Sequence, residues 1–355
     1  MNVRLNPIIT ALVAATLFGA ATPLAKALLG TLSPFMVAGL FYLGSGVGLG
    51  IVILVRDFRR APAERKSAQR IQRAEWPWLA AAIIAGGIGG PALLMLGLTS
   101  TSAASSSLLL NLEGVLTAVI AWVVFRENVD IQVFLGMIAI VAGGLMLSWQ
   151  PGEAGLSYGS MLIAGACACW AIDNNLTRKV SSNDALVIAS LKGLIAGSVN
   201  LAIALVTGAS LPAAITVIAA MLTGLAGYGV SLVLFVVALR HLGAARTGAY
   251  FSVAPLFGVA LSLVIWPELP SVPFWIAAAL MTLGIWLHIR ERHMHEHTHV
   301  FVEHTHRHRH DEHHQHEHEH DFPYSGDEPH THPHTHLPIS HTHAHFPDIH
   351  HRHSH

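Results

Sequence analysis

The stretch from residue 103 to residue 125 reads AASSSLLLNLEGVLTAVIAWVVF and contains one ionisable side chain, Glu113. Its 23 residues exceed the roughly 20 that a helix needs to cross the hydrocarbon core of a bilayer. Apolar stretches of similar length recur over the first 290 residues. We expect ten membrane-spanning helices, at residues 7–29, 34–55, 76–98, 103–125, 131–149, 157–177, 185–207, 218–240, 245–266 and 271–289.

The composition of the whole chain excludes a water-soluble fold. Of its 355 residues, 52% are hydrophobic and 12% are charged, about half the charged share of a soluble domain. The charges divide unevenly: residues 1–290 hold 16 basic and 10 acidic residues, and residues 291–355 hold 4 and 11. The second segment also contains 24 of the 26 histidines. The chain is therefore a hydrophobic, mildly basic body that ends in an acidic, histidine-rich tail.

Basic residues are confined to every second loop of the predicted body. The loop after the second span carries Arg56, Arg59, Arg60, Arg65, Lys66, Arg70 and Arg73. The alternate loops, near residues 30–33, 99–102, 150–156, 208–217 and 267–270, contain no Lys or Arg. Because positive loops stay on the cytoplasmic side, we expect a multi-pass protein of the inner membrane with both termini in the cytoplasm.

The two halves of the body resemble each other. Phe125-Arg126-Glu127 closes the fourth span and Trp266-Pro267-Glu268 closes the ninth, at an offset of 141 that also pairs Gly86 with Gly227. Five spans in each half would insert the second half upside down, and inverted repeats are typical of secondary transporters with a midplane site. We predict an all-α integral membrane protein of two inverted five-helix repeats, 1–150 and 151–290, with a disordered cytoplasmic tail at 291–355.

The motifs of the first repeat, taken together in their sequence order, resemble the EamA type of the drug/metabolite transporter (DMT) superfamily. They are Leu112-Glu113-Gly114, where the family commonly reads Leu-Glu-Pro, then Phe125-Arg126-Glu127 and Gly143-Gly144. The second repeat keeps the proline in Ala254-Pro255 but has no glutamate there. The resemblance covers about residues 7–289. It implies a transporter that exports amino acids, metabolites or drugs, usually driven by an ion gradient.

Four ionisable residues lie inside predicted spans, where a charged side chain is costly and usually has either a counter-charge or a functional role. At a helical rise of 1.5 Å per residue, Asp173 lies roughly 6 Å and Lys192 roughly 10 Å from the inner membrane surface. We expect these two to form an ion pair. Glu113 lies roughly 18 Å deep, near the midplane, and is the candidate carboxylate for proton or substrate coupling. Lys26 is close to the outer surface, where its side chain can reach the interface.

Other polar and aromatic residues in the spans are secondary candidates for the substrate path. Asn174 follows Asp173 directly, and amides of this kind often join helices by hydrogen bonds. Asn111 is two residues from Glu113 and points to another helix face, so we do not expect these two to pair. Trp170 and Tyr228 are candidates for lining a cavity, although membrane packing explains them equally well.

The tail alternates histidine with Glu, Thr, Arg and Pro, a low-complexity pattern that favours disorder. Neutral imidazole binds Zn, Ni or Co, and alternation places histidines on one side of an extended chain. A low-complexity tail without a metal role and a pH-responsive patch are the alternatives. The candidate metal-binding residues of low selectivity are His293, His295, His297, His299, His304, His306, His308, His310, His313, His314, His316, His318 and His320.

Export of a small organic solute, amino-acid-like or drug-like, is the function that the body favours. A divalent transition-metal exporter with a histidine-rich capture tail is the second interpretation, and a metal-sensing membrane protein without transport is the third. The sequence contains no enzyme signature and no phosphate-binding loop. We expect the lipid bilayer and a small molecule as partners, no nucleic acid, no required cofactor, and a homodimer as one option for assembly.

Overall fold

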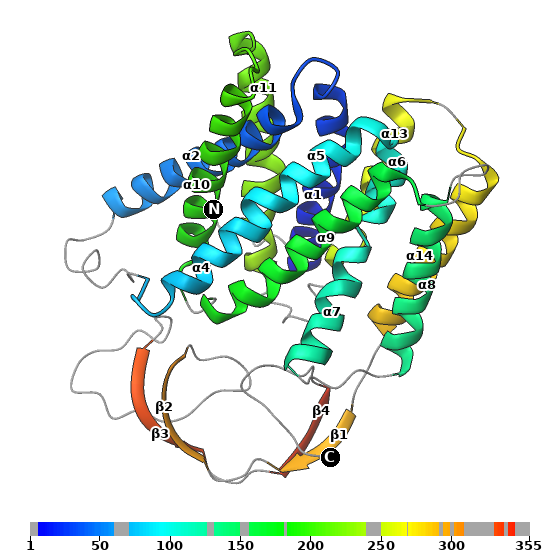
Figure 1. Ribbon diagram of the computed structural model, residues 1–355. Helices are drawn as coiled ribbons and strands as arrows, with labels where there is room; N and C mark the ends of the chain where they lie inside the picture. The colour runs from blue at the N-terminus through cyan, green and yellow to red at the C-terminus, as the bar shows by residue number, and fades with distance from the viewer. Residues whose placement is uncertain are drawn as a thin grey trace.

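The computed structural model of the protein describes most of the body and four short segments of the tail. The described residues are 6–59, 71–125, 131–149, 156–180, 183–238, 250–267, 269–290, 294–298, 302–308, 330–336 and 340–344. The body is a bundle of helices, and the tail segments lie off one end of it (Figure 1). We call that end the tail end and the opposite end, where α14 begins, the pocket end.

Helices lie at all ten positions where the sequence predicts a span. Their bounds are α1 (Pro7–Leu28), α2 (Pro34–Arg59), α4 (Trp76–Ala82), α5 (Gly90–Ser100), α6 (Ala103–Leu109), α7 (Leu112–Phe125), α8 (Ile131–Ser148), α9 (Tyr158–Thr177), α10 (Ala185–Val206), α11 (Ala214–Gly224), α13 (Ala254–Ile265) and α14 (Val272–Arg290). A short 3-10 turn, η2 (Arg178–Val180), follows α9.

Seven stretches of the described chain are long and apolar enough to cross a membrane. The 20-residue helix α9 is not among them, and it carries the polar run Asp173-Asn174-Asn175. The apolar parts of α13 and α14 are shorter than 18 residues. A multi-pass helical membrane protein is thus confirmed, and the count of ten spans stays a prediction.

The fourth predicted span is interrupted between α6 and α7. The side-chain amide of Asn111 donates to the Leu108 carbonyl at 2.9 Å, and the Asn111 backbone N–H bonds the same carbonyl at 3.1 Å. An Asn side chain that competes for backbone groups in this way disrupts regular helix. The interruption lies directly before Glu113.

Two π-helical segments interrupt the third and eighth spans at corresponding places. They are η1 (Ile83–Gly89), between α4 and α5, and η3 (Leu225–Val230), after α11. Gly86 in η1 and Gly227 in η3 are the pair that the offset of 141 aligns. Such segments widen a helical turn and often occur at functional sites.

Helices of the two predicted repeats approach each other closely through glycine. A Cβ atom on Gly44 of α2 would overlap the backbone of Met221 in α11, and one on Gly224 would overlap the Phe41 carbonyl. Further along the bundle α14 packs on α8, where a Cβ on Gly284 would meet Ile140 (Figure 1). Small residues are what allow membrane helices to pack at this distance.

We expect Gly224→Ala to destabilise the bundle because the added methyl group has no space. Overpacking of this kind typically costs about 1–3 kcal/mol. Gly114→Ala is the matched control, since nothing lies within 4 Å of a Cβ atom there and alanine favours helix. Thermal unfolding of the purified variants should show a lower Tm for Gly224→Ala only. Equal Tm values would show that α2 and α11 separate without cost.

The tail segments form two antiparallel pairs of strands where the sequence predicts disorder. β1 (Met294–Thr298) pairs with β4 (Ser340–Ala344), and β2 (Val302–His308) pairs with β3 (His330–His336). At these four segments the prediction differs from the structure. The physical reason is that pairing gives the backbone groups that point toward the partner strand a hydrogen bond without requiring an apolar core.

Candidate functional site

The predicted ion pair between α9 and α10 is present. The Lys192 ammonium lies 2.5 Å from Asp173 Oδ1 and 2.7 Å from Oδ2, and the two side chains are 17% and 10% exposed. The Thr177 hydroxyl also donates to Asp173, at 2.8 Å. Thr177 was not anticipated, although its spacing of four residues from Asp173 places it on the same helix face. The carboxylate is therefore both neutralised and held in position.

Asp173 lies against the middle of the third predicted span. A Cβ atom on Gly86 would overlap the Asp173 carboxylate, so these two residues are in contact. Gly86 lies ten residues into the span that begins at Trp76, which corresponds to roughly 15 Å. The estimate of about 6 Å assumed that the membrane surface coincides with Thr177. The helical path continues through η2 beyond this residue, so the depth of Asp173 below the membrane surface stays a prediction.

Glu113 on α7 is bonded to α9 through an amide. The Asn174 side chain donates to Glu113 Oε1 at 2.9 Å and lies 3.4 Å from the Thr117 hydroxyl. Asn175 adds a second link by donating to the Thr117 carbonyl at 3.3 Å. The side chain of Glu113 is half-buried and Asn174 is exposed, with open space beside Gly114. Glu113 thus bonds the residue of α9 that directly follows Asp173.

The carbonyls of η1 accept hydrogen bonds from three surrounding helices. Tyr42 Oη and Trp170 Nε1 both donate to the Gly86 carbonyl at 2.9 Å, and Asn200 Nδ2 donates to the Gly87 carbonyl at 3.2 Å. A π-helical turn leaves carbonyls available for such side chains. Tyr42 was missed by sequence reasoning, because no local signal separates it from an ordinary packing aromatic.

Tyr228 brings the second π-helical segment to the same place. Its ring centroid lies 5.3 Å from that of Tyr42, 5.8 Å from that of Phe41 and 6.0 Å from that of Phe18. The two interrupted spans, one from each predicted repeat, therefore meet through an aromatic cluster beside the Asp173–Lys192 pair.

Two of the residues considered from sequence lie apart from this group. Asn111 is buried, bonds the Leu108 carbonyl and lies 4.0 Å from the Met281 sulfur. Lys26 donates to the Leu98 carbonyl at the end of α5. The structure thus brings together Glu113, Asn174, Asp173, Lys192, Trp170 and Tyr228.

Histidines of the tail occupy paired positions in the strand register. The paired positions are His295 with His343, His297 with His341, His304 with His334, His306 with His332 and His308 with His330. The remaining candidates lie outside the described residues: His293, His299, His310, His313, His314, His316, His318 and His320. Within the described part of the chain, no group of three or more His, Cys, Asp or Glu side chains is placed to hold a metal ion.

Comparison with known proteins matches the body to transporters. A sequence model of the EamA-like transporter family matches two segments, residues 5–149 and 157–290. An uncharacterized transporter of Methanothermobacter thermautotrophicus is 26% identical over 295 residues, covering 80% of this chain and 86% of that protein. The uncharacterized transporter YyaM of Bacillus subtilis is 24% identical over 282 residues, covering 75% and 88%.

A solved crystal structure shares the fold. It superposes with a TM-score of 0.57 at 18% sequence identity, covering 79% of this chain and 95% of the other. At this identity the likeness concerns the arrangement of the helices alone.

Proposed function

The chain belongs to the EamA-like transporter family, and we propose that it is a secondary transporter that exports a small organic solute by ion coupling. The observation that carries the proposal is the contrast between its two mid-bundle carboxylates. Asp173 has Lys192 as a counter-charge, whereas the hydrogen-bond partner that the structure gives Glu113 is a neutral amide. A carboxylate without a counter-ion inside a membrane is a functional residue by default.

The proposed coupling uses Glu113 as the group that alternates between the charged and the neutral form. Loss of its proton leaves a buried charge, which is costly until a cation or the solute arrives. Open space beside Gly114 gives that ligand somewhere to bind. A secondary transporter opens its site alternately to the two sides of the membrane. The π-helical segments η1 and η3 are the elements whose helix direction would change between these two states.

The test is solute uptake into proteoliposomes that contain the full-length protein and an imposed pH gradient. A panel of labelled amino acids, carboxylates and amines should include at least one solute whose uptake depends on the gradient. Protein-free liposomes are the control. Uptake that ignores both pH and sodium gradients for every solute would contradict ion coupling.

We further propose an inner-membrane location with both termini in the cytoplasm, which the basic loops support. Reporter fusions after residue 60 and at the C-terminus should both report the cytoplasm, and a fusion in the loop at 208–217 should report the opposite side. A periplasmic signal from either of the first two would reverse the orientation.

Export of a divalent transition metal is the second candidate, and the paired histidine positions of the tail favour it. Residues directly opposite each other in an antiparallel pair have Cβ atoms about 4.5–5.5 Å apart. Five such histidine pairs are distributed over the two pairs of strands. Metal sensing without transport is the remaining alternative.

In each case we propose no enzymatic activity, no required cofactor and no nucleic-acid partner. The lipid bilayer is a proposed partner, and a homodimer is one option for assembly.

Deleting residues 293–355 separates the two candidates. We expect the truncated protein to insert, to keep solute uptake and to lose its response to added Zn²⁺ or Ni²⁺. Zn²⁺ binding by the full-length protein should weaken as the pH falls through about 6.5, because metal ligation needs neutral imidazole. Loss of zinc, nickel or cobalt tolerance in cells, with no organic solute transported, would favour the metal exporter instead.

A further inference from the structure

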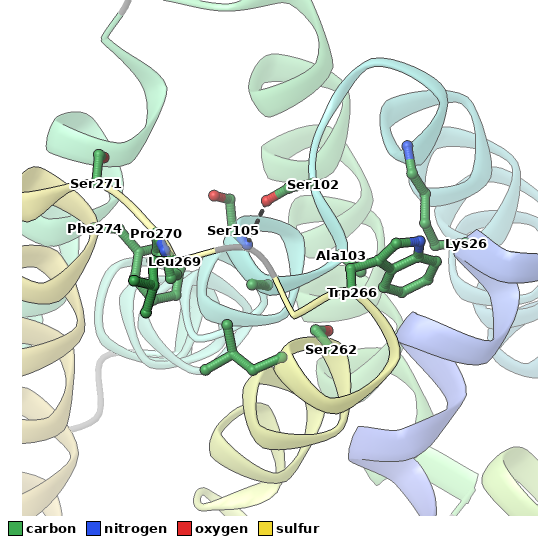
Figure 2. A pocket seen from close by; sticks show the side chains of 12 residues that line it. Lys26, Ser102, Ala103, Ser105, Ser262, Trp266, Leu269, Pro270, Ser271 and Phe274 are labelled. Carbon is green, nitrogen blue, oxygen red and sulfur yellow. Dashed lines mark hydrogen bonds between the residues drawn. The ribbon is translucent and has the colours of Figure 1, made fainter.

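A pocket of about 380 Å³ opens at the pocket end of the bundle, between the two repeats. Lys26 from α1 and the start of α6 line one side, and the end of α13 and the start of α14 line the other. Figure 2 shows Lys26 across the pocket from Leu269 and Phe274. Because α14 leads from this pocket to the tail over 19 residues, roughly 28 Å, the pocket and the tail lie at opposite membrane surfaces.

The polar groups of the pocket favour an anion. Lys26 is a cation, and the lining residues that the structure describes include no carboxylate. The Lys26 ammonium donates one hydrogen bond to the Leu98 carbonyl, and an ammonium has three donors. Capping of α5 explains that one bond. The other polar side chains among the described lining residues are hydroxyl groups: Ser102, Ser105, Ser262 and Ser271.

The apolar side of the pocket limits the kind of anion. Trp266, Phe274, Leu263 and Leu269 line it. A pocket of this size fits a small ligand, and aromatic and aliphatic walls favour an apolar side group over a second charge. One cation with hydroxyl donors suits a carboxylate.

The pocket is separated from the mid-bundle site by close packing of small residues. A Cβ atom on Gly19 of α1 would overlap the Ala254 carbonyl, and one on Gly258 of α13 would overlap the Ser107 side chain of α6. These contacts join the helices that line the pocket, and they join the two repeats. In this conformation these contacts pack the helices closely between the pocket and the mid-bundle site.

We propose that this pocket is the release-side binding site for the solute, and that the solute is a small monocarboxylate with an apolar or aromatic side group. The inference rests on the proposed export function. Lys26 binds the carboxylate, and the indole and phenyl rings hold the side group. Opening of the Gly19 and Gly258 contacts connects the pocket to the mid-bundle site during transport.

Calorimetry of the full-length protein in detergent tests the site without transport. Phenylacetate should bind at least tenfold more tightly than phenylacetamide, its neutral analogue. Lys26→Met should weaken phenylacetate binding at least tenfold and leave phenylacetamide unchanged, whereas Lys26→Arg should retain most of the affinity. Arg73→Gln removes a positive charge from an exposed position outside the pocket and should have no effect. Equal affinity for the two ligands would overturn the proposal.

A second variant keeps the test independent of any folding role of Lys26. Ser105→Trp fills the pocket and preserves the charge, so it should abolish phenylacetate binding. Wild-type affinity in this variant would overturn the site. Binding that depends on Lys26, in a protein that transports no solute, would support the pocket as a binding site and contradict export. Uptake that depends on Glu113, with binding that does not depend on Lys26, would support export and contradict the pocket as its binding site.

Discussion

Glu113→Gln should reduce gradient-driven solute uptake to the level of protein-free liposomes while leaving the protein folded and inserted. Glutamine preserves the size of the side chain and can still bond Asn174, which lies 2.9 Å from Glu113 Oε1. It cannot lose a proton, so the step that links solute movement to the ion gradient is missing. Uncoupled exchange of solute between two equal pools should survive, because the size of the side chain and its bond to Asn174 are kept.

The measurement compares net uptake under a pH gradient with exchange at equal pH. Asp57→Asn is the matched control, since it removes a carboxylate at the end of α2, where Asp57 pairs with Arg56 and is 37% exposed. That variant should behave as the wild type. Unchanged uptake and unchanged pH dependence in Glu113→Gln would reduce Glu113 to a packing residue.

Asp173 and Lys192 should depend on each other for folding. Either Asp173→Asn or Lys192→Met leaves one uncompensated charge in a buried place, which costs on the order of 3–5 kcal/mol. The double substitution removes both charges and should recover much of that loss. Folded yield and Tm of the two single variants and the double variant measure the coupling as a double-mutant cycle.

The ion pair between Arg56 and Asp184 provides the comparison. Its side chains are 24% and 27% exposed, so solvent screens the charges and the pair should contribute about 0–1 kcal/mol. Arg56→Gln tests this without disturbing the Asp184 side chain, which caps α10 by accepting from the Leu186 N–H at 3.0 Å. Additive losses for Asp173 and Lys192, or an equal loss for Arg56→Gln, would show that burial does not strengthen the mid-bundle pair.

The membrane-spanning helices could be predicted from the sequence because the bilayer imposes a length and an apolar composition on each one. The opposite charges of Asp173 and Lys192 on successive spans were sufficient to predict their pairing, since an unpaired charge in a membrane is costly. The assignment of Glu113 as the prominent carboxylate needed only its distance from the ends of its span.

The tertiary structure alone decided which groups meet these residues. The pairing of Glu113 with Asn174 depends on how α7 and α9 are rotated against each other, and helices that are apolar on every side give no periodic signal of rotation. The contact of Asp173 with Gly86 likewise depends on helix tilt, which counting from a span end ignores. Tyr42 and Trp170 share the Gly86 carbonyl because η1 widens the helix there. The pocket around Lys26 forms where α1 and α6 meet α13 and α14, so contacts between helices distant in sequence create it.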